Sequence, residues 1–319
     1  GLSVTATQEV IQDLAARSDV WKITPNEITV LPTFAPTSEL DWENLSKVNA
    51  PSLWDLGFDG QGIVVANMDS GVDVSHPDLA SRWRGGSNSW FDPHGQHATP
   101  ADFTGHGTQT MGAMVGGDAS GSAIGVAPAA QWIAVKIFDD NGQSTSADIH
   151  AGYQWLMDPD GNPNTADAPH VVNNSWNFTI PGCNLEFELD LQALRAMGIL
   201  PVFSAGNAGP GSGTSLSPAN NPSAFAVGAT DENDQINGLS SRGPSACDQA
   251  TFPDVVAPGV NIRTTDLFGH YPNDSGTSLA APHVSGGLAL LLTAVADRDF
   301  TTSWQEAGLI SGAADLGSN

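Results

Sequence analysis

The chain has 319 residues, of which 40% are hydrophobic, and this is enough for one large α/β core with or without a small accessory unit. Only 10 Lys and Arg stand against 35 Asp and Glu, which gives a formal net charge of −25. No basic patch is available to neutralise phosphates, so nucleic acid and anionic membranes are excluded as partners. An acidic surface that keeps the protein soluble explains this charge better than adaptation to high salt. No apolar run reaches the ~20 residues of a membrane span.

Residues 1–36 differ from the rest of the chain in their pattern of strand and helix signals, and this pattern predicts a small α+β unit. Its expected elements are a strand, a helix and a hairpin: Leu2–Ala6, Gln8–Arg17, and Val20–Ile23 with Ile28–Leu31. These elements are too few to be stable alone, so we expect the unit to pack on its neighbour. Pro32–Thr37 is expected to be a linker because it contains two prolines.

From Asp41 onward, signals for strands and helices alternate. The expected strands are short apolar runs: Ile63–Met68, Trp132–Phe138, Val171–Ser175, Ile199–Phe203, Ala224–Ala229 and Asp254–Ala257. The expected helices are Leu45–Leu56, Thr108–Val115, Ser146–Met157, Phe187–Met197 and a buried apolar helix from Ser278 to Leu292. This order predicts a doubly wound, mostly parallel central sheet with helices on both faces. We divide the chain into residues 1–36 and a main domain, 37–319.

Polar residues follow directly after several of the expected strands. Asp69 follows the first strand, Ser175 and Asn177 close the third, and Asn207 follows the fourth. His106 stands between two glycines at the start of a helix. Because binding sites of such sheets lie at the carboxyl ends of the strands, we expect these side chains to gather at one edge.

Four of these polar groups have the types and the chain order needed for nucleophilic catalysis. Ser278 would be the nucleophile, His106 its base, Asp69 the carboxylate that orients the base, and Asn207 the donor to an oxyanion. Each residue alone has an ordinary explanation. Ser278 could be a helix cap and His106 part of a loop, while Asp69 could stabilise a turn through Ser70-Gly71 and Asn207 a left-handed turn. Their joint occurrence favours catalysis.

These segments resemble the motifs of the subtilisin-like serine proteases, or subtilases. Val65–Asp73 is similar to the aspartate motif of that family, and Gly105–Thr108 to its histidine motif. Ser204–Asn207 is similar to the oxyanion segment, and Gly276–His283 to the serine motif. The segments around Val172–Trp176 and Phe203–Asn207 are most similar to the bacillopeptidase F branch.

The resemblance implies a secreted, monomeric serine endopeptidase that cleaves protein and peptide substrates through an acyl-enzyme and needs no cofactor for the chemistry. It also implies that residues 1–31 are the carboxyl-terminal half of an inhibitory pro-segment, which acts as an intramolecular chaperone. The cut between this segment and the enzyme is expected between Leu31 and Asp41, and truncation is expected at both ends of the chain. A permanent N-terminal extension is the alternative.

The resemblance further implies how a substrate is bound. Two backbone edges and a pocket floor are expected at Gly142, Gln143 and Ser144, at Ser175, Trp176 and Asn177, and at Leu216. Ser144 and Asn177 stand where relatives often carry glycine, which leaves the specificity open. Since no Asp or Glu occurs in 204–207 or 216–219, we expect an apolar or small residue before the scissile bond.

Four aspartates are candidate ligands of a structural calcium ion. Asp78 and Asp118 resemble family positions near a calcium loop, although the residues after Asp118 offer few side-chain oxygens. Asp158 and Asp160 begin a turn with oxygens at every second residue. Glycine and prolines break the spacing of an EF-hand there, so an exposed turn is the simpler interpretation.

The spacing of the histidines and cysteines gives little information about metal binding or disulfides. His94 and His97 lie in a loop without a third ligand at helical spacing, which argues against zinc. Cys183 and Cys247 allow one disulfide or two free thiols, and an exported enzyme favours the disulfide.

Three other functions fit the sequence less well. An acid-acting sedolisin-type peptidase would need a Glu base and an Asp oxyanion residue, whereas His106 and Asn207 stand here. A catalytically silent binding protein would have a broken set of catalytic residues, and the set is complete. An esterase would carry a Gly-x-Ser-x-Gly elbow, which does not surround Ser278.

Overall fold

The computed structural model describes residues 2–33, 35–36, 44–295 and 301–317. Its centre is a sheet with the strand order β10-β9-β8-β7-β3-β5-β4, and each of its strand pairs is parallel. These strands are β3 (Val64–Asp69), β4 (Trp90–Phe91), β5 (Gln131–Lys136), β7 (Val171–Asn174), β8 (Leu200–Ser204), β9 (Phe225–Thr230) and β10 (Val255–Pro258). The predicted parallel sheet is confirmed, and β4 is an edge strand too short to be seen in the sequence.

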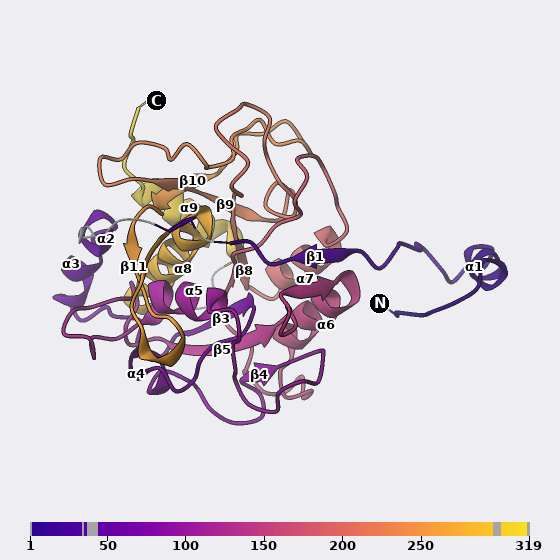
Figure 1. Ribbon diagram of the computed structural model, residues 1–319, viewed down its shortest axis with the longest axis horizontal. Coiled ribbons are helices and arrows are strands. Elements are labelled where there is room, and N and C mark those ends of the chain that lie inside the picture. Colours follow the sequence, from indigo (N-terminus) through magenta and orange to yellow (C-terminus); the bar gives the residue numbers. More distant parts are fainter. Residues whose placement is uncertain (1, 34, 37–43, 296–300, 318–319) are drawn as a thin grey trace.

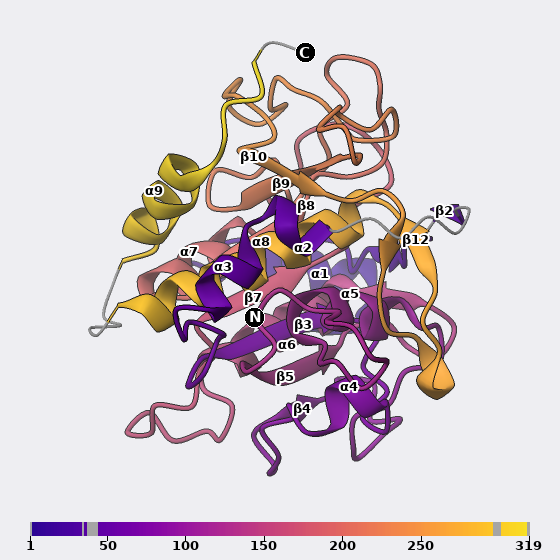
Figure 2. The ribbon, with the colours of Figure 1, turned by 90° about the vertical axis from the view of Figure 1, so that its left-hand side faces the viewer.

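Helices cover both faces of this sheet (Figures 1 and 2). α5 (His106–Val115) and α8 (Thr277–Ala294) pack on one face, and α6 (Ser146–Met157) and α7 (Glu188–Ala196) on the other. In β3, Val65 belongs to the apolar cluster of α5 and α8, whereas Ala66 belongs to that of α6 and α7. Because successive side chains of a strand point to opposite faces, a strand covered on both sides is apolar throughout.

The expected helix over 45–56 is divided in two. α2 (Asn44–Lys47) and α3 (Ala50–Trp54) are separated at Asn49, whose φ of 56° is left-handed and ends the first helix. Pro51 then stands in the first turn of α3, where a proline is tolerated because its missing N–H has no helical partner.

Several short elements complete the fold around the sheet. They are α4 (Pro77–Ala80), α9 (Thr302–Gly312), the 3₁₀ turn Leu267–Gly269, β11 (Ile262–Arg263) and β12 (Asn273–Ser275). β12 leads through Gly276 directly into α8 and pairs with β11 and with β2 (Ala35–Pro36).

The N-terminal residues do not form the unit that the sequence predicts. The predicted helix is confirmed as α1 (Gln8–Ala15), which has no buried residue and lies away from the rest of the protein (Figure 1). The strand predicted at Leu2–Ala6 is irregular. The predicted boundary at 36/37 and much of the expected cleavage interval lie outside the described residues.

The predicted hairpin across Pro25 is wrong. Val20–Ile23 is not a strand, and β1 (Ile28–Val30) pairs antiparallel with β6 (Gln143–Thr145) of the main domain. The edge of β6 offers backbone donors and acceptors to β1, although paired residues such as Thr29 and Ser144 are 115 positions apart in the sequence. No local sequence pattern reveals such a distant partner.

Among the described helices, α8 is long and apolar enough to cross a membrane by length and composition alone. However, 72% of this apolar window is buried inside the protein, as in a core helix.

His283 is buried within α8 and is held as a neutral imidazole. Its Nδ1 lies 2.7 Å from Leu279 O, a carbonyl that can only accept, so Nδ1 carries the proton. Its Nε2 lies 2.7 Å from Asn44 Nδ2, which can only donate. Burial lowers the pKa of His283 to about 4, against the weaker opposing effect of the bond to Leu279.

We expect His283 to make the protein less stable in acid. The unfolded chain binds the proton near pH 6.5 and the folded chain only near pH 4, so the full stability is present above about pH 6.5. It falls on acidification by up to about 3 kcal/mol. The free energy of unfolding in urea, measured between pH 7 and pH 4.5, should fall less steeply in His283→Gln. Equal slopes in the two proteins would contradict this assignment.

Candidate active site

Asp69 and His106 form a buried pair at the carboxyl edge of the sheet. Asp69 ends β3, His106 opens α5, and Nδ1 of His106 lies 2.7 Å from Oδ1 of Asp69. Their side chains are 0% and 4% exposed. The backbone N–H of Ser70 donates to the same carboxylate oxygen at 2.7 Å. The carboxylate therefore orients the ring with its proton on Nδ1, which makes Nε2 the basic atom.

Two glycines allow this pair to meet. A Cβ on Gly107 would lie 2.1 Å from Gly71 O, and one on Gly71 would lie 1.9 Å from Ala101 O. Gly71 also has a φ of +112°, which side chains rarely adopt. The first turn of α5 thus rests directly on the turn that follows β3. Without this close approach, the imidazole would not reach Asp69.

Ser278 is the second residue of α8 and is 2% exposed. Its Oγ donates to Ser175 O at 3.1 Å, and Ser175 Oγ donates to Ser278 O at 2.8 Å. Pro282, four residues on, has no N–H for the carbonyl of Ser278, so Ser175 supplies that hydrogen bond. Ser175 follows β7, the neighbour of β3, and Ser278 therefore lies at the same sheet edge as Asp69 and His106.

Asn207 is fixed against the residue that precedes Ser278. Its Oδ1 accepts hydrogen bonds from Thr277 N at 3.1 Å and from Thr277 Oγ1 at 2.9 Å. The backbone N–H of Thr277 can only donate, so it requires an acceptor, which assigns the oxygen of the amide and leaves Nδ2 as a donor. The structure thus joins Asn207 to the residue directly before Ser278.

The predicted edge at Gly142, Gln143 and Ser144 is covered by the protein's own chain. Thr29 pairs with Ser144, and Gly142 O accepts from Leu31 N at 3.0 Å. Thr29 is 3% exposed, whereas its neighbours in β1 are more than half exposed, so Thr29 is the side chain that enters the protein.

This N-terminal segment continues from the edge toward the histidine. A cavity of about 390 Å³ is lined by Leu31, Pro32 and Thr33 on one side and by Thr104 and His106 on the other. The segment thus continues from the added strand β1 to a cavity beside His106.

The second predicted edge has mixed exposure. Trp176 is fully buried and contacts Phe187 and Phe203 edge-on, so its side chain belongs to the core and only its backbone can meet a substrate. Asn177 Nδ2 donates to Ser204 O at 2.9 Å. Leu216 is 6% exposed and lies so close to Gly206 that a Cβ there would meet it at 2.4 Å. It is therefore next to the Asn207 segment.

Asp102 joins the two halves of the Asp69–His106 pair, and the sequence analysis missed it. Its Oδ1 accepts from Ser70 Oγ at 3.0 Å and from the backbone of Thr104 and Gly105. Its Oδ2 accepts from Thr108 N at 3.0 Å and Thr108 Oγ1 at 2.7 Å. Gly105, the N-cap of α5, has no side chain to cap the helix, so Asp102 does so. A carboxylate four residues before His106 is the signal that could have revealed it.

Lys136 is a second residue that was missed. It ends β5 opposite Asp69, is fully buried, and its Nζ donates to Ser70 O at 2.9 Å. Its ion-pair partner is Asp140 at 3.2 Å. A lysine at the end of an otherwise apolar strand is unusual enough to have marked this position.

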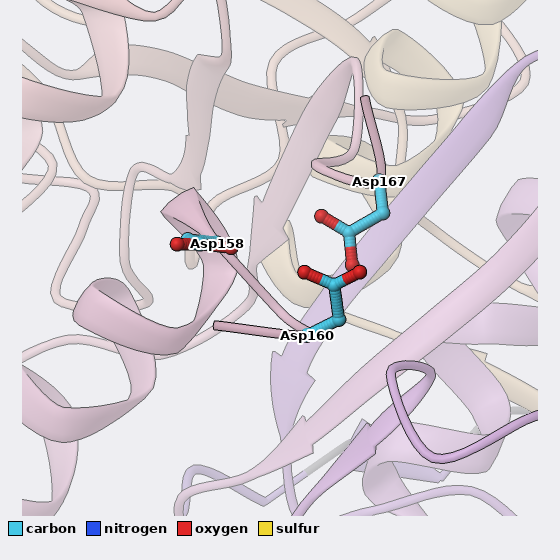
Figure 3. Close-up of side chains that lie close together, drawn as sticks. All are labelled: Asp158, Asp160 and Asp167. Carbon is cyan, nitrogen blue, oxygen red and sulfur yellow. The ribbon is translucent and has the colours of Figure 1, made fainter. Parts of the chain in front are cut away.

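The calcium candidates divide into two groups. Asp158 and Asp160 lie with Asp167, which was not predicted, and ligand atoms of the three carboxylates are within 4.8 Å of one another. Figure 3 shows the carboxylates of Asp160 and Asp167 facing each other. The Asp78 carboxylate instead accepts from Ala119 N at 2.6 Å and Tyr271 OH at 2.7 Å. Asp118, next to Ala119, is exposed, and its backbone carbonyl accepts from Gly121 N at 2.8 Å. Calcium binding stays a prediction for either group.

Cys183 and Cys247 form a disulfide, with their Cα atoms 4.8 Å apart. Of the two alternatives left by the sequence, the disulfide is confirmed. It joins the loop after Trp176 to the loop before β10.

The family model of the subtilases (Peptidase_S8, subtilase family) matches residues 60–318. The chain belongs to the subtilase family. The subtilase is 39% identical over 325 aligned residues to bacillopeptidase F of Bacillus subtilis (strain 168), covering 91% of this chain and 22% of that protein. It is 36% identical over 247 residues to Subtilisin Savinase of Lederbergia lenta, covering 77% and 82%. It is also 36% identical over 247 residues to an alkaline protease of Shouchella clausii, covering 77% and 58%.

These matches show the subtilase family that the sequence motifs predict. The similarity to bacillopeptidase F agrees with the predicted branch. The chain spans about a fifth of the length of bacillopeptidase F, since the match covers 22% of it.

We expect Asp102→Asn to lower kcat/KM by on the order of 10- to 100-fold, because a displaced His106 loses its geometry for proton transfer. The loss should appear mainly in kcat. The matched control is Asp92→Asn, since Asp92 accepts three backbone N–H groups in a neighbouring loop without contacting Ser70 or α5. Steady-state kinetics and melting temperatures of both variants provide the test. A comparable loss of activity in both would show that the effect is only one of loop stability.

Proposed function

We propose that the protein is a secreted endopeptidase in which Ser278 is the nucleophile and His106 its general base. Asp69 holds the imidazole in the tautomer that leaves Nε2 basic, and the 2.7 Å Asp69–His106 bond is the observation that carries the proposal. The buried site strengthens this interaction because little water screens it.

The reaction proceeds in two halves. Ser278 Oγ attacks the peptide carbonyl carbon while its proton passes to His106 Nε2, and the carbonyl oxygen becomes an oxyanion. Asn207 Nδ2 and the N-terminus of α8 stabilise that oxyanion. The C–N bond then breaks, and His106 gives its proton to the leaving amine. Water, deprotonated by His106, attacks the acyl carbon. The bond from that carbon to Ser278 Oγ then breaks as His106 returns the proton to Oγ, which restores the site.

The chemistry requires no metal or cofactor, because the nucleophile, the base and the oxyanion donors are all groups of the chain itself. A calcium ion at Asp158, Asp160 and Asp167 would act on stability only. Export is supported by the Cys183–Cys247 disulfide, which persists in an oxidising environment. The acidic charge supports a monomer that avoids nucleic acid.

Residues 1–31 are proposed to be part of an inhibitory pro-segment. The support is the added strand β1, which occupies the backbone edge that a substrate would use. Leu31 binds Gly142 O, and the following residues reach the cavity beside His106. The segment blocks the groove as a bound peptide.

Ser278→Ala should abolish covalent labelling by a serine-reactive phosphonate and lower kcat by on the order of 10³-fold or more. Asn207→Leu should keep the labelling site but lower kcat by about 10²- to 10³-fold. Labelling is followed by intact-protein mass spectrometry, before and after a limited protease cuts the N-terminal segment. The enzyme proposal fails if the intact and the cut protein both stay unlabelled.

The residue before the scissile bond is proposed to be apolar or small. Leu216, beside Gly206, gives the pocket an apolar wall, and neither 204–207 nor 216–219 contains a carboxylate. A peptide library varied at this position should show Leu, Phe, Met or Ala cleaved at least tenfold faster than Lys or Arg, because a cation would be desolvated without a partner. Preference for Arg or Lys would overturn the assignment.

A further inference from the structure

The N-terminal segment touches the main domain well beyond the β6 edge. Lys22 Nζ lies 3.0 Å from Glu186 Oε2, and Thr24 Oγ1 donates to Glu186 Oε1 at 2.8 Å. Glu186 precedes α7, and Lys22 stands nine residues before Leu31. One carboxylate thus holds two side chains of the segment at a site remote from Ser278.

Between this carboxylate and the β6 edge, the segment follows the N-terminus of α6. Ser146 N donates to Glu27 O at 2.9 Å, and Ala147 N donates to Asn26 Oδ1 at 2.8 Å. These N–H groups belong to the first turn of a helix, where no intrahelical acceptor exists. A main-chain carbonyl and a side-chain oxygen of the segment therefore satisfy them.

Glu186 is held in place by the main domain itself. Its backbone N–H donates to Asn184 Oδ1 at 2.9 Å, and His150 lies between Asp190 Oδ2, at 2.8 Å, and Glu186 Oε1, at 3.4 Å. The Glu186 side chain is only 11% exposed. The preceding residues are tied by the disulfide at Cys183. The carboxylate therefore does not depend on the segment for its position.

We propose that Glu186 and the α6 N-terminus form a distal subsite for protein substrates that carry a basic residue nine positions before the residue bound to Gly142. The inference rests on the proposed function, because it requires that substrates pair with β6 as β1 does. Antiparallel pairing with β6 sets one direction, so a long substrate continues over Ser146 and Ala147 toward Glu186. Ser146 N at the start of α6 binds a main-chain carbonyl, so this contact accepts any substrate side chain. Glu186, in contrast, selects a positively charged side chain.

The space along this path suits variable side chains. A cavity of about 550 Å³ lies between Glu27–Val30 of the segment and residues 178–184 of the main domain. Ile28 and Val30, which border it, are 66% and 51% exposed, so other side chains fit at their positions. Selection along the path therefore falls on the charge at the position of Lys22.

The gain from this subsite is modest. The Lys22 side chain is 46% exposed in its pair with Glu186, and such half-exposed pairs change an equilibrium about two- to fivefold. We expect this change in kcat/KM, through KM, because the contact is made equally in the ground state and in the transition state.

The test uses the chain with Lys22→Ala and Thr24→Ala after a limited protease has cut and removed the N-terminal segment, because the intact segment occupies the β6 edge. The two substitutions weaken the hold of Glu186 on that segment, so that it leaves after the cut. Two quenched peptides of identical composition span from Glu186 past His106, one with Lys at the distal position and one with that Lys moved two residues toward the N-terminus. A third, short peptide ends before the α6 contact and reports the proposed function alone. The ratio of kcat/KM for the two long peptides is then compared among variants.

We expect a ratio of about two to five, which falls to about one in Glu186→Gln. It should persist in Asp55→Asn, the matched control, because Asp55 is exposed beside α3 on the side away from α6 and α7 (Figure 1). If the ratio is one in the protein with only Lys22→Ala and Thr24→Ala, the distal subsite is overturned. Cleavage of the short peptide by that protein would still support the proposed endopeptidase function. If Glu186→Gln only speeds cleavage of all three peptides, Glu186 serves the chain's own segment, and the inference is wrong. No cleavage of any peptide would remove the proposed function and the subsite together.

Discussion

The structure depends on the close contact between the turn after β3 and the first turn of α5. Gly71 and Gly107 have no side chains that would separate these two turns. Asp102 accepts hydrogen bonds from both turns, from Ser70 in one and from Thr108 in the other. Asp69 and His106 consequently meet inside the protein, where water does not compete for their hydrogen bond. The contact costs conformational freedom at both glycines, and the buried helices around it offset that cost.

A second contact ties the nucleophile to the sheet. Pro282 leaves the carbonyl of Ser278 without its helical hydrogen bond, and Ser175 replaces it while accepting a bond from the Ser278 hydroxyl. The start of α8 is thus joined to the residue that follows β7, and Thr277 is joined in turn to Asn207 after β8. Neighbouring strands therefore position the nucleophile and the oxyanion donor, and no single loop does so.

The substrate groove illustrates how one surface serves two partners. The free edge of β6 binds any extended chain through its backbone, and here β1 occupies it. The sequence analysis treated residues 1–36 as a unit with its own hairpin, because Val20–Ile23 and Ile28–Leu31 have the local pattern for one. The stronger contacts of this segment lie in the main domain, at Gly142, Ser146 and Glu186.

The sequence by itself determined the parallel sheet and the identity of the four catalytic candidates. Apolar runs between helical patterns indicate strands buried on both faces. Asp69 ends β3, Asn207 lies in the loop after β8 and Ser278 lies in the first turn of α8, and a local pattern can place such positions. Asp102 and Lys136 were missed because their roles depend on hydrogen bonds to residues far away in the chain. Both bond to Ser70, and Asp102 also bonds to Thr108 in α5. Whether Cys183 and Cys247 form a disulfide, the third carboxylate at Asp167 and the pairing of β1 with β6 were decided only by the tertiary structure. Each of them joins residues far apart in the chain, and such contacts depend on how the whole sheet and its loops pack, whereas periodicity reports only on neighbours in sequence.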